Sequence, residues 1–167
     1  VFAPLALAKG NRAIGPLSQG ELELGGQLML GPVRVFFPES EPVLKFENGQ
    51  SKGVVHKFCK PAFVFGCSAA DTKSINFVDR FFETDFIDPN YKARREGALI
   101  AAYTGFVSGD DFEAVATQGY DVQFAVLKDG SCLVKPGSDE GAALIEELED
   151  ASSDADVRWK ELEQKTR

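Results

Sequence analysis

The chain has 167 residues, of which 44% are hydrophobic, 26% charged and 11% aromatic, a composition typical of a soluble globular protein with one domain and a full-sized core. Its net charge of −8 argues against nucleic-acid binding, because phosphate backbones would repel the molecule. The best apolar run, from Ala98 to Val107, is too short to span a membrane. We therefore expect no nucleic-acid partner and no membrane-spanning segment.

The charge is distributed unevenly along the chain. Residues 138–167 contain ten acidic and four basic residues, a local charge of −6, whereas residues 52–60 contain three lysines and no acidic residue. An uneven distribution of this kind would allow the protein to bind a partner of opposite charge. The simpler interpretation is that both charged segments lie on ordinary solvated faces.

The three cysteines, Cys59, Cys67 and Cys132, have neither a zinc-like nor a Cys-x-x-Cys spacing, which favours a reducing compartment. One disulfide with one free thiol stays an alternative. The opening run VFAPLALA ends in small residues like those that precede a signal-peptidase site, so a processed organellar protein is a second alternative.

Residues 1–20 combine apolar residues with three glycines and two prolines, without helical or strand periodicity. This composition predicts an extended apolar arm with no regular element. Such an arm either folds back on its own domain or is covered by another subunit, and we expect cover by a partner.

From Glu21 to Cys67 the hydrophobic pattern has a period of two, which predicts an antiparallel sheet of short strands. A hairpin is expected around Gly25-Gly26, since apolar and polar residues alternate on both sides of it. The further predicted strands are Val33–Phe37, Val43–Phe46, Val54–Phe58 and Ala62–Phe65.

After Cys67 the period lengthens and predicts helices. The first begins near Asp71 and ends before Pro89, and the second begins at Asp88-Pro89 and continues through Leu99 to Gly109. A short third helix is expected from Asp110 to Gln118. The residues Lys92, Arg94, Arg95 and Glu96 are able to pair with acids across a contact, although solvated helix charges are the simpler interpretation.

Residues 121–135 again alternate around Asp129-Gly130, which predicts a late hairpin that joins the first sheet. From Ser138 onward, apolar residues at spacings of three and four predict one long acidic helix, with an interruption near Ser152-Ser153 as an alternative. The predicted class is α+β, with an extended arm at 1–20, a globular body at 21–137 and an acidic C-terminal helix at 138–167.

Cys67 is the sharpest candidate for chemistry. It follows a predicted strand and precedes a predicted helix, and a helix N-terminus lowers the pKa of a thiol. His56 is the only histidine, so a histidine-based proton transfer would have to use it. A buried structural cysteine and a histidine without catalytic role are the simpler interpretations of both residues.

No metal or cofactor signature is present in the sequence. The residues Asp85, Asp88 and Asn90 lack the spacing of a calcium loop, and the run from Gly10 to Gly15 continues with Pro16-Leu17 instead of the lysine and hydroxyl residue of a phosphate loop. We therefore expect no cofactor and no metal.

The chain has fourteen phenylalanines, and two of them, Phe81 and Phe82, are adjacent on a predicted helix. Adjacent residues cannot both face one core stripe, so one of the two is expected to face a partner, a cofactor or the other strands. The candidates for partner contact are Phe2, Leu5, Leu7, Phe81 and Trp159.

The run LIAAYTGFVSG (residues 99–109) slightly resembles a helix of phycobilisome linker domains, in which an Ala-Ala-Tyr triplet precedes a short apolar stretch. The basic residues that follow that tyrosine in those domains are absent here. We therefore assign neither the family nor bilin attachment to any cysteine.

The sequence favours a non-catalytic, linker-like interaction or scaffold subunit over an enzyme, because every catalytic signature fails while both terminal segments resemble contact segments. We expect it to dock on a larger protein complex through its N-terminal arm and C-terminal helix. Peripheral membrane association through a protein partner stays an alternative. The alternatives are a thiol-dependent enzyme or redox protein that uses Cys67, and a small-ligand carrier whose Phe-rich sheet encloses a pocket.

Overall fold

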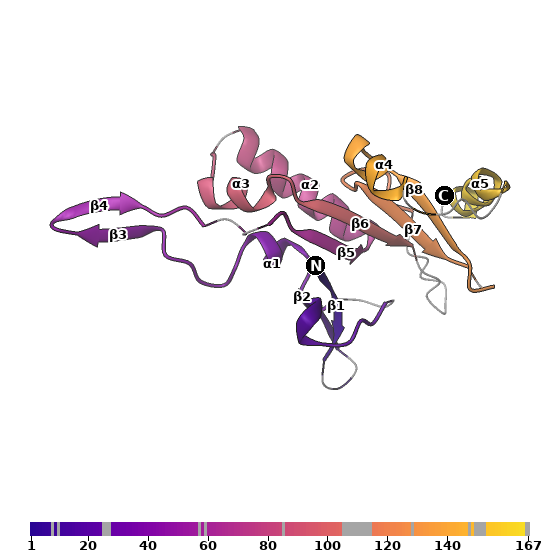
Figure 1. The fold of residues 1–167 in the computed structure, drawn as a ribbon, viewed down its shortest axis with the longest axis horizontal. Coiled ribbons are helices and arrows are strands. Elements are labelled where there is room, and N and C mark those ends of the chain that lie inside the picture. The colour runs from indigo at the N-terminus through magenta and orange to yellow at the C-terminus, as the bar shows by residue number, and fades with distance from the viewer. Residues whose placement is uncertain are drawn as a thin grey trace.

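The computed structural model describes residues 1–7, 9, 11–24, 28–56, 58, 60–84, 86–104, 115–127, 129–146, 148 and 153–165. The fold is α+β, as predicted, with one six-stranded sheet, a separate two-stranded hairpin and helices around the sheet (Figure 1). The elements are, in chain order, β1 (Phe2–Ala6), β2 (Arg12–Pro16), the 3₁₀ turn η2 (Leu17–Gln19), α1 (Val33–Phe36), β3 (Leu44–Glu47), β4 (Gln50–Gly53), β5 (Phe63–Cys67), α2 (Ala69–Thr84), α3 (Pro89–Arg95), β6 (Leu99–Thr104), β7 (Val122–Val126), β8 (Cys132–Pro136), α4 (Asp139–Ile145) and α5 (Ala155–Lys165).

The large sheet has the strand order β2-β1-β5-β6-β7-β8. Its four inner strands run parallel, while β2 and β8 are antiparallel to their neighbours at the two edges. The predicted antiparallel sheet is therefore a mixed one. The late hairpin β7–β8 joins the main sheet as predicted, with its turn at Asp129-Gly130.

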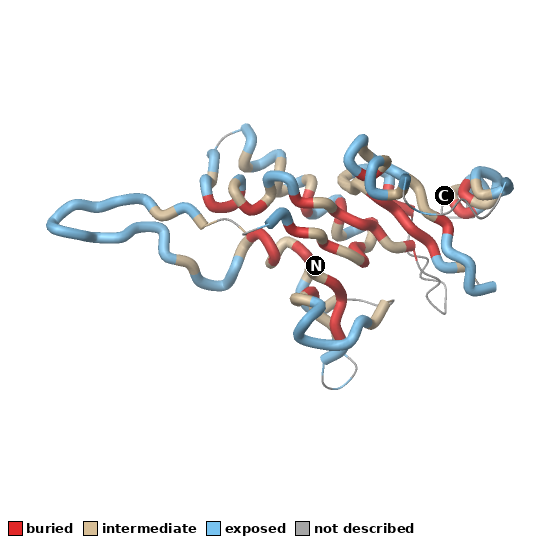
Figure 2. Tube along the Cα trace, in the orientation of Figure 1, coloured by how far each residue is buried: buried red, intermediate tan, exposed pale blue. Residues whose placement is uncertain are grey.

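One face of the sheet is covered by helices and carries two apolar cores. In the first core, Phe36 of α1 and Ile75 of α2 pack with Val64 and Ile100 of β5 and β6, and all four side chains are fully buried. In the second core, Trp159 and Leu162 of α5 pack against Ala125 and Leu133 of β7 and β8. Buried residues follow the central strands, as the red segments of Figure 2 show.

The hairpin β3–β4 lies apart from this body and extends from it along the long axis of the molecule (Figure 1). Both strands are exposed along their whole length. The base of the hairpin is fixed to α3 on both sides. Before β3, Glu41 pairs with Arg94, and after β4 the backbone N–H of His56 donates to Asn90 Oδ1 at 2.7 Å.

The prediction of an irregular arm at residues 1–20 is wrong, because Phe2–Ala6 and Arg12–Pro16 are strands of the main sheet. Their apolar residues are covered by this chain itself: Ala3, Leu5 and Ile14 are buried. The expected cover by a partner is not needed for these side chains.

Three further local predictions fail. The hairpin predicted around Gly25-Gly26 is not formed by Leu22 and Leu30, which instead make isolated bridges to Leu5 and Ala13. The predicted strand Val33–Phe37 is the single helical turn α1, and the strand expected at Val54–Phe58 lies earlier in the chain, as β4.

The largest error concerns residues 99–104, which form the central strand β6 and not the continuation of a helix. The second helix does begin at Asp88-Pro89 but ends at Arg95. The start of the helix predicted from Asp110 to Gln118 falls on residues 105–114, which lie outside the described residues. The acidic C-terminal segment is divided into α4 and α5, with the expected interruption falling largely in 149–152, also outside the described residues.

Candidate interaction site on α2 and α3

Cys67 has the predicted position at the end of β5, just before α2. Its side chain is fully buried, and its Sγ lies 4.0 Å from the carbonyl oxygen of Val64. Burial raises the pKa of the thiol far above its usual value, and the nearby Asp71 carboxylate raises it further. Since the thiolate is the nucleophilic form, the geometry does not support a reactive Cys67.

His56 does not complete a catalytic pair with Cys67. Its ring Nε2 lies 3.1 Å from the carbonyl oxygen of Pro42, at the base of the β3–β4 hairpin. The two residues therefore bind different groups on different elements. Within the described ranges, no cluster of three or more His, Cys, Asp or Glu side chains is arranged to hold a metal ion.

The predicted partner-contact residues fall into two groups. Leu5 and Trp159 are buried in this chain's own cores, and Phe2 is half-buried against Phe58. Leu7 and Phe81 are exposed. Buried side chains cannot anchor a partner, so Leu5 and Trp159 are unsuited to that role, and Leu7 and Phe81 are the exposed candidates.

Phe81 belongs to a larger exposed feature. Phe77 and Phe81 lie one turn apart on α2 and are 70% and 50% exposed, and Phe86 and Ile87, just beyond the helix, are also exposed. The neighbouring Phe82 points inward and packs against Phe37 and Tyr91 with ring centroids 5.3 and 5.0 Å apart. We call Phe77, Phe81, Phe86 and Ile87 the aromatic ridge.

The ridge is connected to the core through aromatic contacts. The Phe82 ring lies edge-on to Phe81 at 5.1 Å and contacts Phe86 at 6.3 Å. These contacts hold Phe81 and Phe86 against the core. An anchor that is already ordered loses little conformational entropy when it binds.

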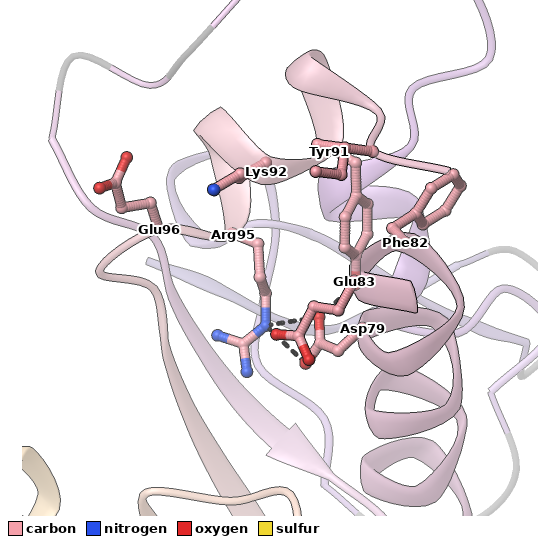
Figure 3. Close-up of a pocket in the computed structure, with 8 residues that line it drawn as sticks. Asp79, Phe82, Glu83, Tyr91, Lys92, Arg95 and Glu96 are labelled. Atoms are coloured by element: carbon pink, nitrogen blue, oxygen red, sulfur yellow. Dashed lines mark hydrogen bonds and ion pairs between the residues drawn. The ribbon is translucent and has the colours of Figure 1, made fainter. Parts of the chain in front are cut away.

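A cluster of polar groups lies beside the ridge, between α2 and α3 (Figure 3). The hydroxyl of Tyr91 donates to Asp79 Oδ1 at 2.6 Å, and Arg95 Nε donates to the same carboxylate at 3.1 and 3.2 Å. Arg95 Nη1 also donates to the carbonyl oxygen of Ala98 at 2.9 Å. Asp79 therefore joins α2 to both turns of α3.

Asp79, Tyr91 and Arg95 line a pocket of about 320 Å³ together with apolar and charged neighbours. The remaining lining residues are Phe82, Glu83, Ile87, Lys92 and Glu96. Ile87 belongs to the ridge as well, so pocket and ridge form one continuous surface. Among the described residues, Glu83 and Glu96 make no ion pair, and their carboxylates are exposed at the pocket.

The sequence contained part of the signal for this cluster. Arg94 and Arg95 do pair with acids across contacts, with Glu41 and Asp79 respectively. The partner acids could not be identified because they lie 53 and 16 residues away in the sequence. Tyr91 gave no signal beyond its spacing of four residues from Arg95, which places both on one helix face.

Comparisons with known proteins do not identify this chain: no protein-family model, no curated protein and no solved structure matches it. No helix in the described part of the chain combines the length and the apolar character needed to cross a membrane.

The buried phenol and thiol predict a loss of stability at alkaline pH. Burial and the hydrogen bond to Asp79 raise the pKa of Tyr91 above its usual 10.0, and burial raises the pKa of Cys67 above its usual 9.0. The native state thus retains protons that the unfolded chain releases. The free energy of unfolding is therefore expected to be unaffected by these groups at neutral pH and to fall as the pH rises above about 9.

Urea unfolding at a series of pH values between 7 and about 11 checks this expectation. In Tyr91→Phe and in Cys67→Ala, the slope of unfolding free energy against pH should be shallower than in the unmodified chain. Equal slopes in all three proteins would show that the native state does not raise the pKa of Tyr91 or of Cys67.

Proposed function

We propose that this protein is a non-catalytic interaction subunit that docks on a partner protein, as part of a larger assembly, through the aromatic ridge of α2. The observation that carries the proposal is the exposure of four large apolar side chains in one ridge, beside a pocket with charged walls. Large exposed apolar patches with a polar border are typical of protein interaction sites.

The energetic argument depends on the type of side chain. Burying a Phe or Ile side chain contributes about 1.5–3 kcal/mol. Aromatic residues at the centre of an interface are often those whose truncation costs most, and polar groups around them exclude water. In this ridge Phe77 and Phe81 would be the central anchors, with the pocket at its border.

The charges favour a basic partner. The chain has a net charge of −8, and the exposed Glu83 and Glu96 line the pocket together with Lys92 and Arg95. A partner that presents an apolar surface with a Lys or Arg side chain would cover the ridge and place its cation between these carboxylates. Complementary charge of this kind mainly increases the association rate and the specificity.

The docking surface proposed on α2 differs from the two terminal segments that were expected from the sequence. The N-terminal residues are core strands, and the apolar side of α5 is used by Trp159 and Leu162 within the chain. Docking through α2 therefore replaces docking through the N-terminal arm. Of the sequence candidates, Phe81 is the one that lies on the ridge.

The two alternative functions have less support. The burial and raised pKa of Cys67 argue against a thiol-dependent enzyme. A carrier would need a pocket enclosed by the Phe-rich sheet, whereas the rings of Phe65 and Phe124 stack on each other at 4.5 Å. The pocket at α2 and α3 is lined by other residues.

A capture experiment with a matched control tests the proposal. The tagged chain, the double variant Phe77→Ser/Phe81→Ser and the control Phe46→Ser are each used to recover binding proteins from the source extract, and the recovered protein is then purified and titrated by calorimetry. Phe46 is 74% exposed but lies on β3, away from α2. Loss of two central aromatic anchors is expected to weaken binding by about 2–4 kcal/mol or more.

The control variant should bind like the unmodified chain, and all three proteins should remain folded, with only a small loss of thermal stability in Phe77→Ser/Phe81→Ser from the lost Phe81–Phe82 contact. Recovery of the same partner with undiminished affinity by Phe77→Ser/Phe81→Ser would refute docking through the ridge. Recovery of no partner by the unmodified chain would refute the interaction function.

A further inference from the structure

The β3–β4 hairpin has two chemically different faces. The register pairs Leu44 with Gly53, Lys45 with Lys52 and Phe46 with Ser51. Since residues directly opposite each other lie on the same face of an antiparallel pair, Leu44 and Phe46 form an apolar face. The other face carries Lys45 and Lys52 side by side.

Neither face is covered by the rest of the chain. Leu44 is 53% and Phe46 74% exposed, and the whole hairpin is drawn as exposed in Figure 2. An isolated two-stranded hairpin is only marginally stable in water, and like charges directly opposite each other destabilise it further. Glu47 forms an ion pair with Lys45, whereas Lys52 forms none among the described residues. We therefore expect the hairpin to be stabilised by packing against a second surface.

The opposite end of the molecule has the complementary character. Residues 136–157 contain eight acidic residues and neither Lys nor Arg. Within the described part of this segment, Leu144 of α4 and Leu148 are exposed and four residues apart, and Glu140 and Glu146 are exposed without an ion pair. An apolar pair bordered by carboxylates therefore faces solvent at α4.

The basic hairpin and the acidic α4 cannot meet within one molecule. They lie toward opposite ends of the long axis, with the hairpin beyond α3 and α4 beside β8 (Figure 1). The hairpin is also held in its extended position, because Glu41 and His56 anchor its two ends to α3. Contact between the two surfaces requires a second copy of the chain.

We infer that the β3–β4 hairpin of one copy docks on α4 of a second copy, so that the protein associates head to tail. Leu44 and Phe46 lie on Leu144 and Leu148 of the second copy, and the long Lys45 and Lys52 side chains reach around the edge of the thin hairpin toward its carboxylates. Salt reduces an attraction between such exposed charges, with a screening length of about 8–10 Å at physiological ionic strength.

This contact uses different patches on the two copies, so each copy keeps one free hairpin and one free α4. Such heterologous contacts lead to open chains or to closed rings, depending on the rotation between neighbours. The interface is small and leaves the aromatic ridge and the pocket free. Self-association and docking on another protein are therefore independent properties.

Sedimentation velocity of the purified full chain tests the inference. At low ionic strength the weight-average sedimentation coefficient should rise with protein concentration between about 5 and 200 µM, as expected for a contact with micromolar to submillimolar affinity. Added salt at about 0.5 M should weaken the association at least roughly tenfold, because screening reduces attraction between exposed charges. A sedimentation coefficient independent of concentration at low salt would overturn the inference.

A charge-exchange experiment identifies the two surfaces. The hairpin variant Lys45→Glu/Lys52→Glu and the α4 variant Glu140→Lys/Glu146→Lys each place like charges on both surfaces, so each alone should sediment as a monomer. An equimolar mixture restores opposite charges at every contact between unlike variants and should associate again. Both variants keep a negative net charge, so the recovery cannot come from attraction between whole molecules.

The control is Lys73→Glu/Arg80→Glu, which changes the net charge as much as the hairpin variant does but alters exposed residues of α2. It should associate like the unmodified chain. Loss of association in this control, or a mixture of the two variants that stays monomeric, would overturn the inference. The ridge variant Phe77→Ser/Phe81→Ser should still self-associate, and loss of association in it would assign the contact to α2 and refute the hairpin contact.

Discussion

Leu5→Ala is expected to lower the free energy of unfolding by about 2–5 kcal/mol, the range found for large-to-small changes in well-packed cores. Leu5 of β1 is 7% exposed, and its Cδ1 lies close to Gly15 and Gly20, which have no side chains. The surroundings can collapse little into the space left by an alanine. The measurement is urea unfolding followed by circular dichroism.

Leu7→Ala is the matched control, since Leu7 is the same residue type two positions further along and is 48% exposed. Its effect should stay within about 0.5 kcal/mol, as for most surface substitutions. Equal effects of the two changes would mean that the N-terminal segment is not part of the core. The result therefore decides between the core strand that the structure places at Phe2–Ala6 and the partner-covered arm expected from the sequence.

The parts of the fold that the sequence predicted correctly are those set by local chemistry. Asp88 caps α3, with Oδ1 accepting from the backbone N–H groups of Asn90 and Tyr91 at 2.8 and 2.9 Å. Gly130 has a positive φ of 83° in the predicted turn between β7 and β8. Caps and turns depend on two or three neighbouring residues, so their signals are present in the sequence itself.

The central strand β6 was missed for a different reason. A strand that is buried on both faces has no alternation, and its continuous apolar run resembles a buried helix. Five of the six residues from Leu99 to Thr104 are Leu, Ile, Ala or Tyr, and the helix capped by Asp88 was extended through them. Only the pairing with Phe63–Cys67 on one side and Val122–Val126 on the other makes this run a strand.

Pro4 is one reason why the strand β1 was not predicted from the sequence. Pro4 cannot donate a ladder hydrogen bond, which argues against an inner strand. In the structure β1 pairs with β5 through Phe2 alone, and the Pro4 carbonyl oxygen accepts from the N–H of Glu23 at 3.0 Å. The missing donor therefore costs no hydrogen bond with β5.

The candidate site also contains some features that local sequence predicts and others that depend on tertiary packing. The outward position of Phe81 could be inferred because Phe82 occupies the inward side of the same helix. The Asp79 bridge between Tyr91 and Arg95 could not, because it depends on how α2 and α3 cross. The lysine pair of the hairpin was available in principle: once the Asn48-Gly49 turn is placed, the register sets Lys45 opposite Lys52.

The second large effect concerns the buried pair between Arg94 of α3 and Glu41. The Arg94 side chain is only 6% exposed, its Nη1 donates to the carbonyl oxygen of Phe36 at 2.7 Å, and its Nη2 pairs with Glu41. Burial already lowers the pKa of this guanidinium. Glu41→Ala leaves the cation buried without its partner and is expected to cost about 3–5 kcal/mol of unfolding free energy.

The chain offers a matched control in the exposed pair between Arg34 and Glu39, in which the Glu39 side chain is 80% exposed. Glu39→Ala should change the unfolding free energy by no more than about 1 kcal/mol, because water screens the pair and replaces it. The double variant Arg94→Met/Glu41→Leu removes both charges and should be more stable than Glu41→Ala alone. If Glu41→Ala and Glu39→Ala have the same small effect, the Arg94 pair does not hold the base of the hairpin to α3, and the extended hairpin position that head-to-tail association needs would lose its main support.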